Sequence, residues 1–247
     1  MKILFMGGKR IGHDCLRYLI ASGHELVGVV VNPGDTAANR WYPSTCELAL
    51  KHHIPVFEWT NINSPDALRS FRTLAPDMII VVYFDQILKR QILDIPSKES
   101  INLHLALVEE YRGCYPTTWA LLNDEKHTGV TIHYIDESID GGDIIAECKV
   151  PIENDDTGRS LYEKCVDAGI QLFSSTFPAI AQGTAQTRPQ DKMKGTYHKR
   201  IFPSQKIDFN KSGREIYNHI RAMIFEPFPS SSFYIGEQRY EIKKAVS

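Results

Sequence analysis

The sequence predicts an α/β protein: an open, mostly parallel twisted sheet with helices on both faces, followed by a small α+β appendage. Short continuous apolar runs at residues 2–6, 25–31 and 78–82 have the length and composition of strands buried on both faces. Segments with helical periodicity separate these runs, which indicates strand–helix–strand units and parallel pairing. After residue 180 the periodicity fades and Gly and Pro recur, so the organisation of the chain changes there.

The remaining elements follow from periodicity and from capping residues. Helices are expected at residues 11–22, 44–52, 64–74 and about 157–180, the third opened by Ser64-Pro65 and the last capped within Asp155-Asp156-Thr157. Further strands are expected at residues 55–57, 100–105, 129–135 and 144–150. The last two flank a turn around Asp140 and are expected to pair antiparallel.

The change of texture predicts two domains, at residues 1–184 and 185–247. The second contains an expected helix at 211–223 and a hairpin of two strands, 231–235 and 239–243, joined by Gly236-Glu237. About sixty residues build little hydrophobic core by themselves. We therefore expect this extension to pack on the main domain or on a second subunit, and we expect a homodimer, since twofold dimers are the commonest oligomers.

Charge and composition argue against several classes of protein. The chain has 28 Lys and Arg against 30 Asp and Glu, a net charge of −2, which argues against a strongly basic nucleic-acid binder. No apolar run approaches the roughly 18 residues that cross a bilayer, and the start, MKILFMGG, is expected to be a buried strand and not a signal peptide. Five cysteines without paired spacing suit reduced thiols, so we expect a cytoplasmic protein. From the charge and the short apolar runs we expect no nucleic-acid and no membrane partner. The histidines are dispersed, and we expect no metal site.

The strongest functional signal is the run Ile101-Asn102-Leu103-His104, with Asp140 in a glycine-containing turn 36 residues after His104. Asn102 and His104 are two apart on an extended segment, so their side chains share one side. Transfer of an acyl group to an amine needs a donor for the developing oxyanion, a base for the amine proton and a carboxylate that orients the imidazole. Asn102, His104 and Asp140 could supply these, although a structural role for the histidine stays open.

Other segments carry weaker signals. The turn Gly7-Gly8-Lys9-Arg10 does not match G-x-G-x-x-G, which disfavours a dinucleotide fold of the NAD type. Free N–H groups at a helix start still attract anions. Lys9 and Arg10 are therefore candidate phosphate contacts, with solvated surface charge as the alternative. Trp41 and Tyr197 could cover a nucleobase or could simply pack.

Several of these motifs together resemble the folate-dependent formyltransferase family. They are Asn102-Leu103-His104, Tyr111-Arg112-Gly113 with Pro116, and residues 129–134 leading to Asp140-Gly141-Gly142, and the resemblance covers most of residues 1–180. It implies the family's Rossmann-like fold, the catalytic residues Asn102, His104 and Asp140, and the cofactor 10-formyltetrahydrofolate. It also implies that backbone groups of two loops hold the pterin, at Tyr83, Phe84, Asp85, Gln86, Ile87, Leu88, Ile139, Gly141, Gly142 and Asp143.

Within the family, the chain resembles the nucleotide-sugar N-formyltransferases. Methionyl-tRNA enzymes usually carry Ser-Leu-Leu-Pro after the histidine, whereas residues 105–110 read LALVEE. The resemblance implies formylation of a dTDP-linked 4-amino-4,6-dideoxy sugar (or a 3-amino or UDP-linked one) for surface polysaccharide. The expected substrate contacts are Lys9, Arg10, Trp41, Tyr111, Arg112, Tyr115 and Tyr197. A ribonucleotide amine or methionyl-tRNA as acceptor, a non-catalytic nucleotide-binding module and an NAD oxidoreductase remain alternatives.

Overall fold

A seven-stranded, mostly parallel sheet forms the centre of the computed structural model, which describes residues 1–35 and 40–244. The strand order is β3-β2-β1-β4-β5-β7-β8. The first five of these strands pair in parallel, and β7 lies antiparallel to both β5 and β8. The strands are β1 (Lys2–Gly7), β2 (Glu25–Val31), β3 (Val56–Glu58), β4 (Met78–Val82), β5 (Ile101–His104), β7 (His127–Tyr134) and β8 (Ile144–Pro151). The predicted fold class and the antiparallel pair are confirmed.

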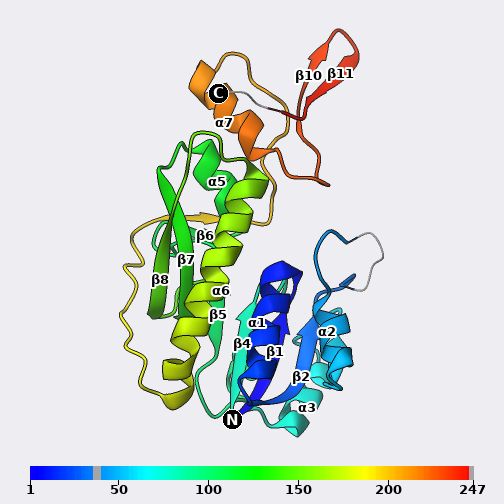
Figure 1. Cartoon of the computed structure of the whole chain (residues 1–247), viewed down its shortest axis with the longest axis vertical. Helices are drawn as coiled ribbons and strands as arrows, with labels where there is room; N and C mark the ends of the chain where they lie inside the picture. The colour runs from blue at the N-terminus through cyan, green and yellow to red at the C-terminus, as the bar shows by residue number, and fades with distance from the viewer. Residues whose placement is uncertain (36–39, 245–247) are drawn as a thin grey trace.

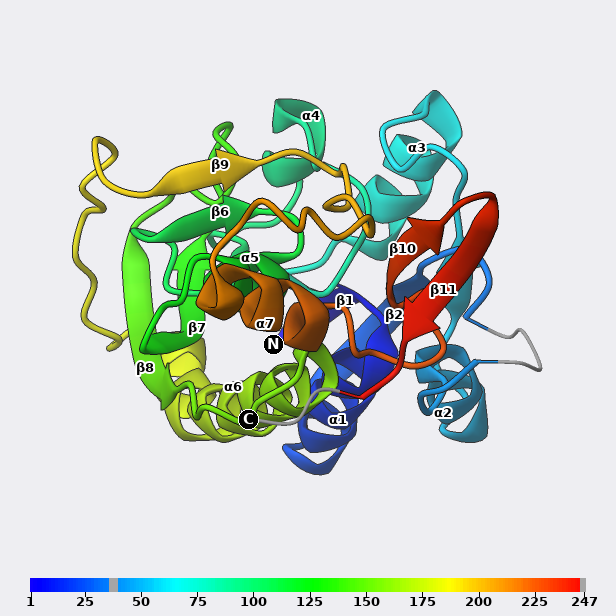
Figure 2. The same cartoon turned by 90° about the horizontal axis from the view of Figure 1, so that it is seen from above.

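Helices cover both faces of this sheet, as Figures 1 and 2 show. One face carries α1 (Lys9–Ala21), α2 (Thr45–Lys51) and α6 (Gly158–Gln182), and the other carries α3 (Pro65–Leu74) and α4 (Arg90–Leu93). The predicted caps are present: the hydroxyl of Ser64 accepts from the third residue of α3, and Thr157 closes a capping box on α6.

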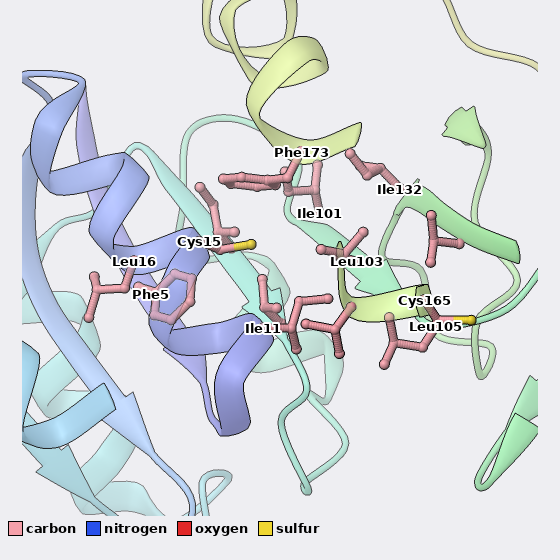
Figure 3. Packing of buried hydrophobic residues seen from close by; sticks show 14 of the residues in the cluster. Phe5, Ile11, Cys15, Leu16, Ile101, Leu103, Leu105, Ile132, Cys165 and Phe173 are labelled. Carbon is pink, nitrogen blue, oxygen red and sulfur yellow. The ribbon is translucent and has the colours of Figure 1, made fainter. Parts of the chain in front are cut away.

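The larger core lies between the sheet and the helices α1 and α6 (Figure 3). Phe5 of β1 and Phe173 of α6 are almost completely buried in it. Ile101 and Leu103 of β5 also point into this core. Because neighbouring residues of a strand face opposite sides, Asn102 and His104 leave β5 on the other face. Burial of Ile101 and Leu103 in the core therefore determines the face of the sheet on which Asn102 and His104 lie.

Two short strands and two short helices were not anticipated. No element was expected between the strands at 100–105 and 129–135, but this stretch contains β6 (Tyr111–Gly113) and α5 (Pro116–Leu122). The stretch after residue 180 contains β9 (Thr196–His198), which pairs in parallel with β6, and the four-residue α4 was also missed. Three or four residues are too few to show a period, so only a distant partner makes such a segment regular.

The C-terminal extension packs on the main body, as expected. Its helix α7 (Gly213–Ala222) lies against α5, whereas the hairpin of β10 (Ser231–Ile235) and β11 (Gln238–Ile242) stands away from the large sheet (Figure 1). The predicted boundary near residue 185 and the predicted homodimer stay predictions.

Arg221 of α7 fastens this extension to the main body. Its side chain is only 1% exposed. Its guanidinium donates to the side chain of Asn218 and to the carbonyls of Glu153, Asn154 and Asp156, which form the turn before α6. A buried guanidinium costs free energy unless its donors are used, and here the carbonyls of that turn use them.

We expect Arg221→Met to lower the free energy of unfolding by about 2–4 kcal/mol, because three carbonyls of the turn and the buried side chain of Asn218 lose their donor. Urea unfolding measures the difference. The matched control is Arg214→Met, since Arg214 pairs with Asp124 at the exposed surface. That exposed pair should be worth less than about 1 kcal/mol. Equal losses in the two variants would contradict the anchoring role of Arg221.

Within residues 1–35 and 40–244, no helix is both long and apolar enough to span a membrane. All five cysteines lie in this described part of the chain, and none of them forms a disulfide. Cys15 and Cys165 are buried in the larger core, where they pack as small apolar side chains.

Candidate active site

The pairing of β5 with β7 places Asn102 directly opposite His133. The Nδ2 atom of Asn102 lies 3.2 Å from the Nε2 atom of His133. His133 Nδ1 donates to the carbonyl of Tyr134 at 2.7 Å, since a carbonyl can only accept, so Nε2 is left to accept from Asn102. Sequence reasoning did not include His133 in the site. His133 could have been suspected from the sequence, because it lies in the expected strand 129–135 that leads into the Asp140 turn.

The Asp140 turn brings a carboxylate down between these side chains. Asp140 Oδ1 lies 3.3 Å from Asn102 Nδ2, 3.8 Å from His104 Nδ1 and 3.6 Å from His133 Nε2. Its Oδ2 accepts from the backbone N–H of Gly113 at 2.8 Å. The three predicted catalytic side chains therefore meet, at the carboxyl end of a parallel strand of the sheet.

The carboxylate of Asp140 is held in its charged form. Burial by itself raises the pKa of this carboxyl. The positive charges that His104 and His133 carry when protonated, together with the N–H of Gly113, outweigh burial. The net effect holds the pKa of Asp140 well below its usual range. Asp140 is therefore an anion at every pH at which the protein is expected to work.

His104 is oriented by contacts at both ring nitrogens. Its Nε2 lies 3.2 Å from the carbonyl of Tyr111, which can only accept, so Nε2 carries a hydrogen. Nδ1 is then the ring atom that exchanges a proton, and the carboxylate of Asp140 faces it. The His104 side chain is 12% exposed, so solvent and ligands have limited access to it.

Gly113 is a site residue that only the fold reveals. Its φ of +86° lies in the region that favours glycine, and a Cβ there would collide with the carbonyl oxygen of His198 on β9. This close approach of β6 and β9 aims the N–H of Gly113 at Asp140. The glycine is therefore needed for the position of the carboxylate.

The loop after β4, residues 83–88, is fixed by side chains from other loops. Asn32 donates to the carbonyl of Tyr83 and accepts from the N–H of Asp85. The carboxamide of Gln86 accepts from Ile62 N and donates to Trp59 O, so both of its ends are already used within the protein. Among the described residues, the backbone N–H groups of Gln86, Ile87 and Leu88 have no protein partner.

The two cations at the start of α1 point in different directions. Lys9, with a φ of +60°, places its Nζ 4.1 Å from the ring centroid of Tyr42 and 5.5 Å from that of Trp41. Arg10 instead donates to Glu163, at 2.6 Å, and to Asp167, both on α6. Carboxylates of α6 thus bind the guanidinium of Arg10 in this structure, and its predicted contact with a phosphate stays a prediction.

Arg200, from the extension, takes a place near Lys9 that the sequence did not predict. Its guanidinium pairs with the carboxylate of Asp85 at 2.8 Å and donates to the carbonyl of the same residue. Burial lowers the pKa of the Lys9 ammonium, and the positive charge of Arg200 lowers it further, while Asp85 and Asp35 act in the opposite direction. Two cations thus gather around Asp85.

Two other predicted substrate contacts turn out to support the site from within. The hydroxyl of Tyr111 donates to Glu125 at 2.8 Å and accepts from Asn123. Arg112 donates to the carbonyls of Lys192 and Lys194. Both side chains therefore bind other parts of the chain, and their predicted contact with substrate stays a prediction.

The remaining aromatic candidates differ in exposure. Trp41 packs edge-on against Tyr162 and Phe225 at the margin of the core. Tyr115 meets Phe202 edge-on with ring centroids 5.1 Å apart, and Tyr197 is half exposed. None of these contacts tests a role in substrate binding, which stays a prediction for all three.

No group of three or more His, Cys, Asp or Glu side chains that could hold a metal gathers within residues 1–35 and 40–244. A surface hollow of about 340 Å³ lies between α3 and α4, at the amino-terminal edge of β4. It is lined by Arg72, Ala75, Gln91, Asp94 and Ile95. The catalytic groups lie at the opposite, carboxyl ends of the strands, so the hollow is separate from them.

An amide, an imidazole and a buried carboxylate anion at the carboxyl end of a parallel strand define an enzyme site suited to acyl transfer. Comparison with known proteins makes the class specific. Residues 1–177 match the family "Formyl transferase", and residues 203–247 match "Formyl transferase, C-terminal domain". The chain belongs to the formyl transferase family, which confirms the resemblance and the expectation of a formyl-transferring enzyme.

The curated relatives fall into two functional groups. The chain is 36% identical over 247 residues to the bifunctional polymyxin resistance protein ArnA of Wigglesworthia glossinidia brevipalpis. The matched region covers 99% of this chain but only 38% of that protein. It is also 36% identical to the methionyl-tRNA formyltransferase of Clostridioides difficile strain 630, over 94% of this chain and 75% of the relative. Sequence similarity therefore supports the family without deciding the acceptor.

The solved structures that resemble the chain include several sugar enzymes. An N-formyltransferase from Helicobacter canadensis, solved with folinic acid and dTDP-3-aminofucose, has a TM-score of 0.80 at 27% identity, covering 96% of this chain and 85% of its own. WlaRD, a sugar 3N-formyl transferase solved with dTDP and 5-N-formyl-THF, has a TM-score of 0.77 at 27% identity, covering 92% and 80%. A 4-N formyltransferase from Francisella tularensis, at 20% identity and a TM-score of 0.80 over 100% and 98%, shows the fold alone.

Proposed function

We propose that this chain transfers the formyl group of 10-formyltetrahydrofolate to the amine of a dTDP-linked amino sugar. The observation that carries the proposal is the likeness to the Helicobacter canadensis enzyme, whose structure contains folinic acid and a dTDP-amino sugar. The resemblance to the nucleotide-sugar N-formyltransferases implies a 4-amino-4,6-dideoxy sugar, and a 3-amino sugar is the nearest alternative. The product would enter the synthesis of a surface polysaccharide such as the O-antigen of lipopolysaccharide.

The residues present fit a folate. Two loops flank the catalytic groups: residues 83–88 follow β4, and residues 139–143 form the Asp140 turn. The unpartnered N–H groups of Gln86, Ile87 and Leu88 suit the ring nitrogens and carbonyl of a pterin, which need donors. Bound 10-formyltetrahydrofolate would supply the activated formyl group, and the chain itself supplies orientation and proton transfer.

In the proposed mechanism, Nδ1 of His104 would accept the proton of the amine that attacks the formyl carbon. It would return a proton to the folate nitrogen as the bond between that nitrogen and the formyl carbon breaks. The carboxylate of Asp140 faces Nδ1 of His104 and stabilises the imidazolium that results. Asn102 now donates to His133 and to Asp140, so donation to the formyl oxygen must replace one of these two bonds. The bond to Asp140 is the longer, at 3.3 Å, and is the one we expect to be exchanged.

The diphosphate of the proposed substrate needs cations near the sheet edge. Lys9 and Arg200 both lie close to Asp85, and α1 begins beside them. We propose that Lys9 and Arg200 contact the diphosphate, and Arg10 stays a predicted contact. Trp41, Tyr115 and Tyr197 stay proposed contacts for the base or the sugar.

Methionyl-tRNA is the second candidate acceptor, because relatives at 35–38% identity are methionyl-tRNA formyltransferases. Binding of tRNA usually relies on a basic surface that neutralises phosphates. The net charge of −2 does not favour this acceptor.

The test is a panel of acceptors assayed with 10-formyltetrahydrofolate. The panel contains dTDP-linked 4-amino and 3-amino dideoxy sugars, UDP-linked analogues, glycinamide ribonucleotide and methionyl-tRNA. Mass spectrometry measures the formylated product, and absorbance measures released tetrahydrofolate. We expect a dTDP-amino sugar to have the highest kcat/KM. Formylation of methionyl-tRNA without formylation of any sugar nucleotide would overturn the proposal.

A further inference from the structure

The segment between the two family matches, residues 178–202, contacts the catalytic groups from outside. In Figure 1 its trace runs past the outer edge of β8, where Ile144 and Arg188 exchange two backbone hydrogen bonds of 2.8 and 2.9 Å. It then reaches β9, which lies beside β6 in Figure 2. Gln190 stands between these two attachments, in neither of the regions that match the family.

Gln190 is bound to the Asp140 turn through one end of its carboxamide. The residue is only 8% exposed. Its Nε2 donates to the carbonyl of Asp140 at 2.8 Å and to the carbonyl of Gly142 at 2.5 Å. Both acceptors are carbonyl oxygens, so the amide can be oriented only one way: reversing it would set Oε1 against two oxygens.

The turn that Gln190 holds is strained and tightly packed. Asp140 has a φ of +51°, a left-handed conformation that is unfavourable for a residue with a side chain and persists only where the surrounding structure enforces it. Gly142 is packed against the carbonyl of Tyr134 so closely that a Cβ would collide with it. The two bonds from Gln190 therefore act on a backbone that needs external support.

The position of this backbone decides where the carboxylate points. Asp140 reaches Asn102 and His104 through Oδ1 and the N–H of Gly113 through Oδ2. Its contacts with Asn102 and His104 are long, at 3.3 and 3.8 Å, so a shift of the turn by one ångström removes them. The same segment also fixes the position of Gly113, because the N–H of the next residue, Cys114, donates to the carbonyl of His198 at 2.8 Å.

We propose that Gln190 is a positioning residue for formyl transfer: its carboxamide holds the Asp140 turn so that the carboxylate faces His104 and Asn102. The proposal rests on the formyl-transferring activity of the family and not on which amine is the acceptor. Gln190 itself touches no reacting atom.

The first readout needs no acceptor, because the N–H of Gly113 reports where the Asp140 carboxylate lies. In Gln190→Leu, which loses both donors, we expect the Gly113 amide proton to move upfield in NMR spectra. We also expect its hydrogen exchange to speed up by about tenfold or more as the bond to Oδ2 opens. The matched control is Arg188→Gln, which removes the exposed ion pairs with Glu109 and Glu147 from the same segment. Its Gly113 resonance should stay native.

The second readout is catalytic, with whichever acceptor the panel identifies. Gln190→Leu should lower kcat by about 10–100-fold, as small misplacements of catalytic groups do, with KM within about threefold of the parent. Gln190→Glu should be impaired in a pH-dependent way. Its ionised carboxylate opposes two carbonyls, whereas its protonated form donates one hydrogen bond, so its kcat relative to the parent should rise as the pH falls from about 8 to 6.

A folded Gln190→Leu protein with a native Gly113 amide and a kcat within about twofold of the parent would overturn the proposal. If Gln190→Leu does not fold, the test is the kcat of Gln190→Glu divided by the kcat of the parent. A ratio that does not change between about pH 8 and pH 6 would overturn the proposal. The two proposals can fail separately. A displaced Gly113 amide in Gln190→Leu would support positioning by Gln190 even if the parent protein formylated no sugar nucleotide, a result that would contradict the proposed acceptor.

Discussion

Replacing His104 with Asn is expected to lower kcat by about 10²–10⁴-fold, the usual contribution of a positioned general base. The amide of Asn is too short to reach the carbonyl of Tyr111 as Nε2 of the imidazole does, and it has no basic nitrogen to take the proton of the amine. His104 lies at the end of β5 with its ring partly exposed, so no core packing is lost. The melting temperature should therefore change little. Steady-state formylation and thermal unfolding of the same preparation measure both effects.

The matched control for His104→Asn is His127→Asn. His127 begins β7 and pairs with Glu110 at 3.2 Å, with its side chain 38% exposed. It makes no contact with Asp140 among the described residues, so the substitution should leave kcat within about twofold of the parent. A His104→Asn enzyme that keeps near-parental kcat would refute the catalytic assignment, whichever amine is the acceptor.

Asp140→Asn should lower kcat by about 10²-fold or more, because the charge that stabilises protonated His104 disappears. The shape of the side chain is kept, and an oxygen can still accept from Gly113 N. An amide that turns its NH2 toward Asn102 or His104 adds a donor where the site needs an acceptor. We expect the effect mainly in kcat, since no substrate contact is removed. A loss confined to KM would contradict this role.

Asp140→Asn also has a pH signature in stability. The folded-state pKa of Asp140 is depressed, so the ionised carboxylate contributes stability above the ordinary aspartate pKa, and this contribution is lost as the pH falls toward the folded-state value. The variant should therefore be less stable than the parent at neutral pH. The gap should narrow below about pH 4. Urea unfolding at several pH values measures it, and a gap that stays constant with pH would contradict the assigned charge state.

Periodicity predicted the large elements correctly because each of them is long enough to repeat its own pattern. The apolar runs of β1, β2 and β4 and the stripe of α6 belong to this group. The segments β6 and β9 were missed, since three residues become a strand only when another strand pairs with them. The partners of Arg10 and Arg112 within the chain could not be predicted for a related reason: a cation near a glycine-containing turn does not reveal that a carboxylate or carbonyl from a distant segment binds it.

By itself the sequence determined the class of fold, the shared face of Asn102 and His104 and the glycine-containing turn of Asp140, because spacing and alternation are properties of the local chain. Tertiary structure alone decided that His133 stands opposite Asn102, that Gly113 donates to Asp140 and that Gln190 holds the turn. These contacts join residues between 27 and 50 positions apart, and such partners follow from strand register and chain crossing. No local pattern of residues encodes them, so only the folded chain shows which polar groups finally meet.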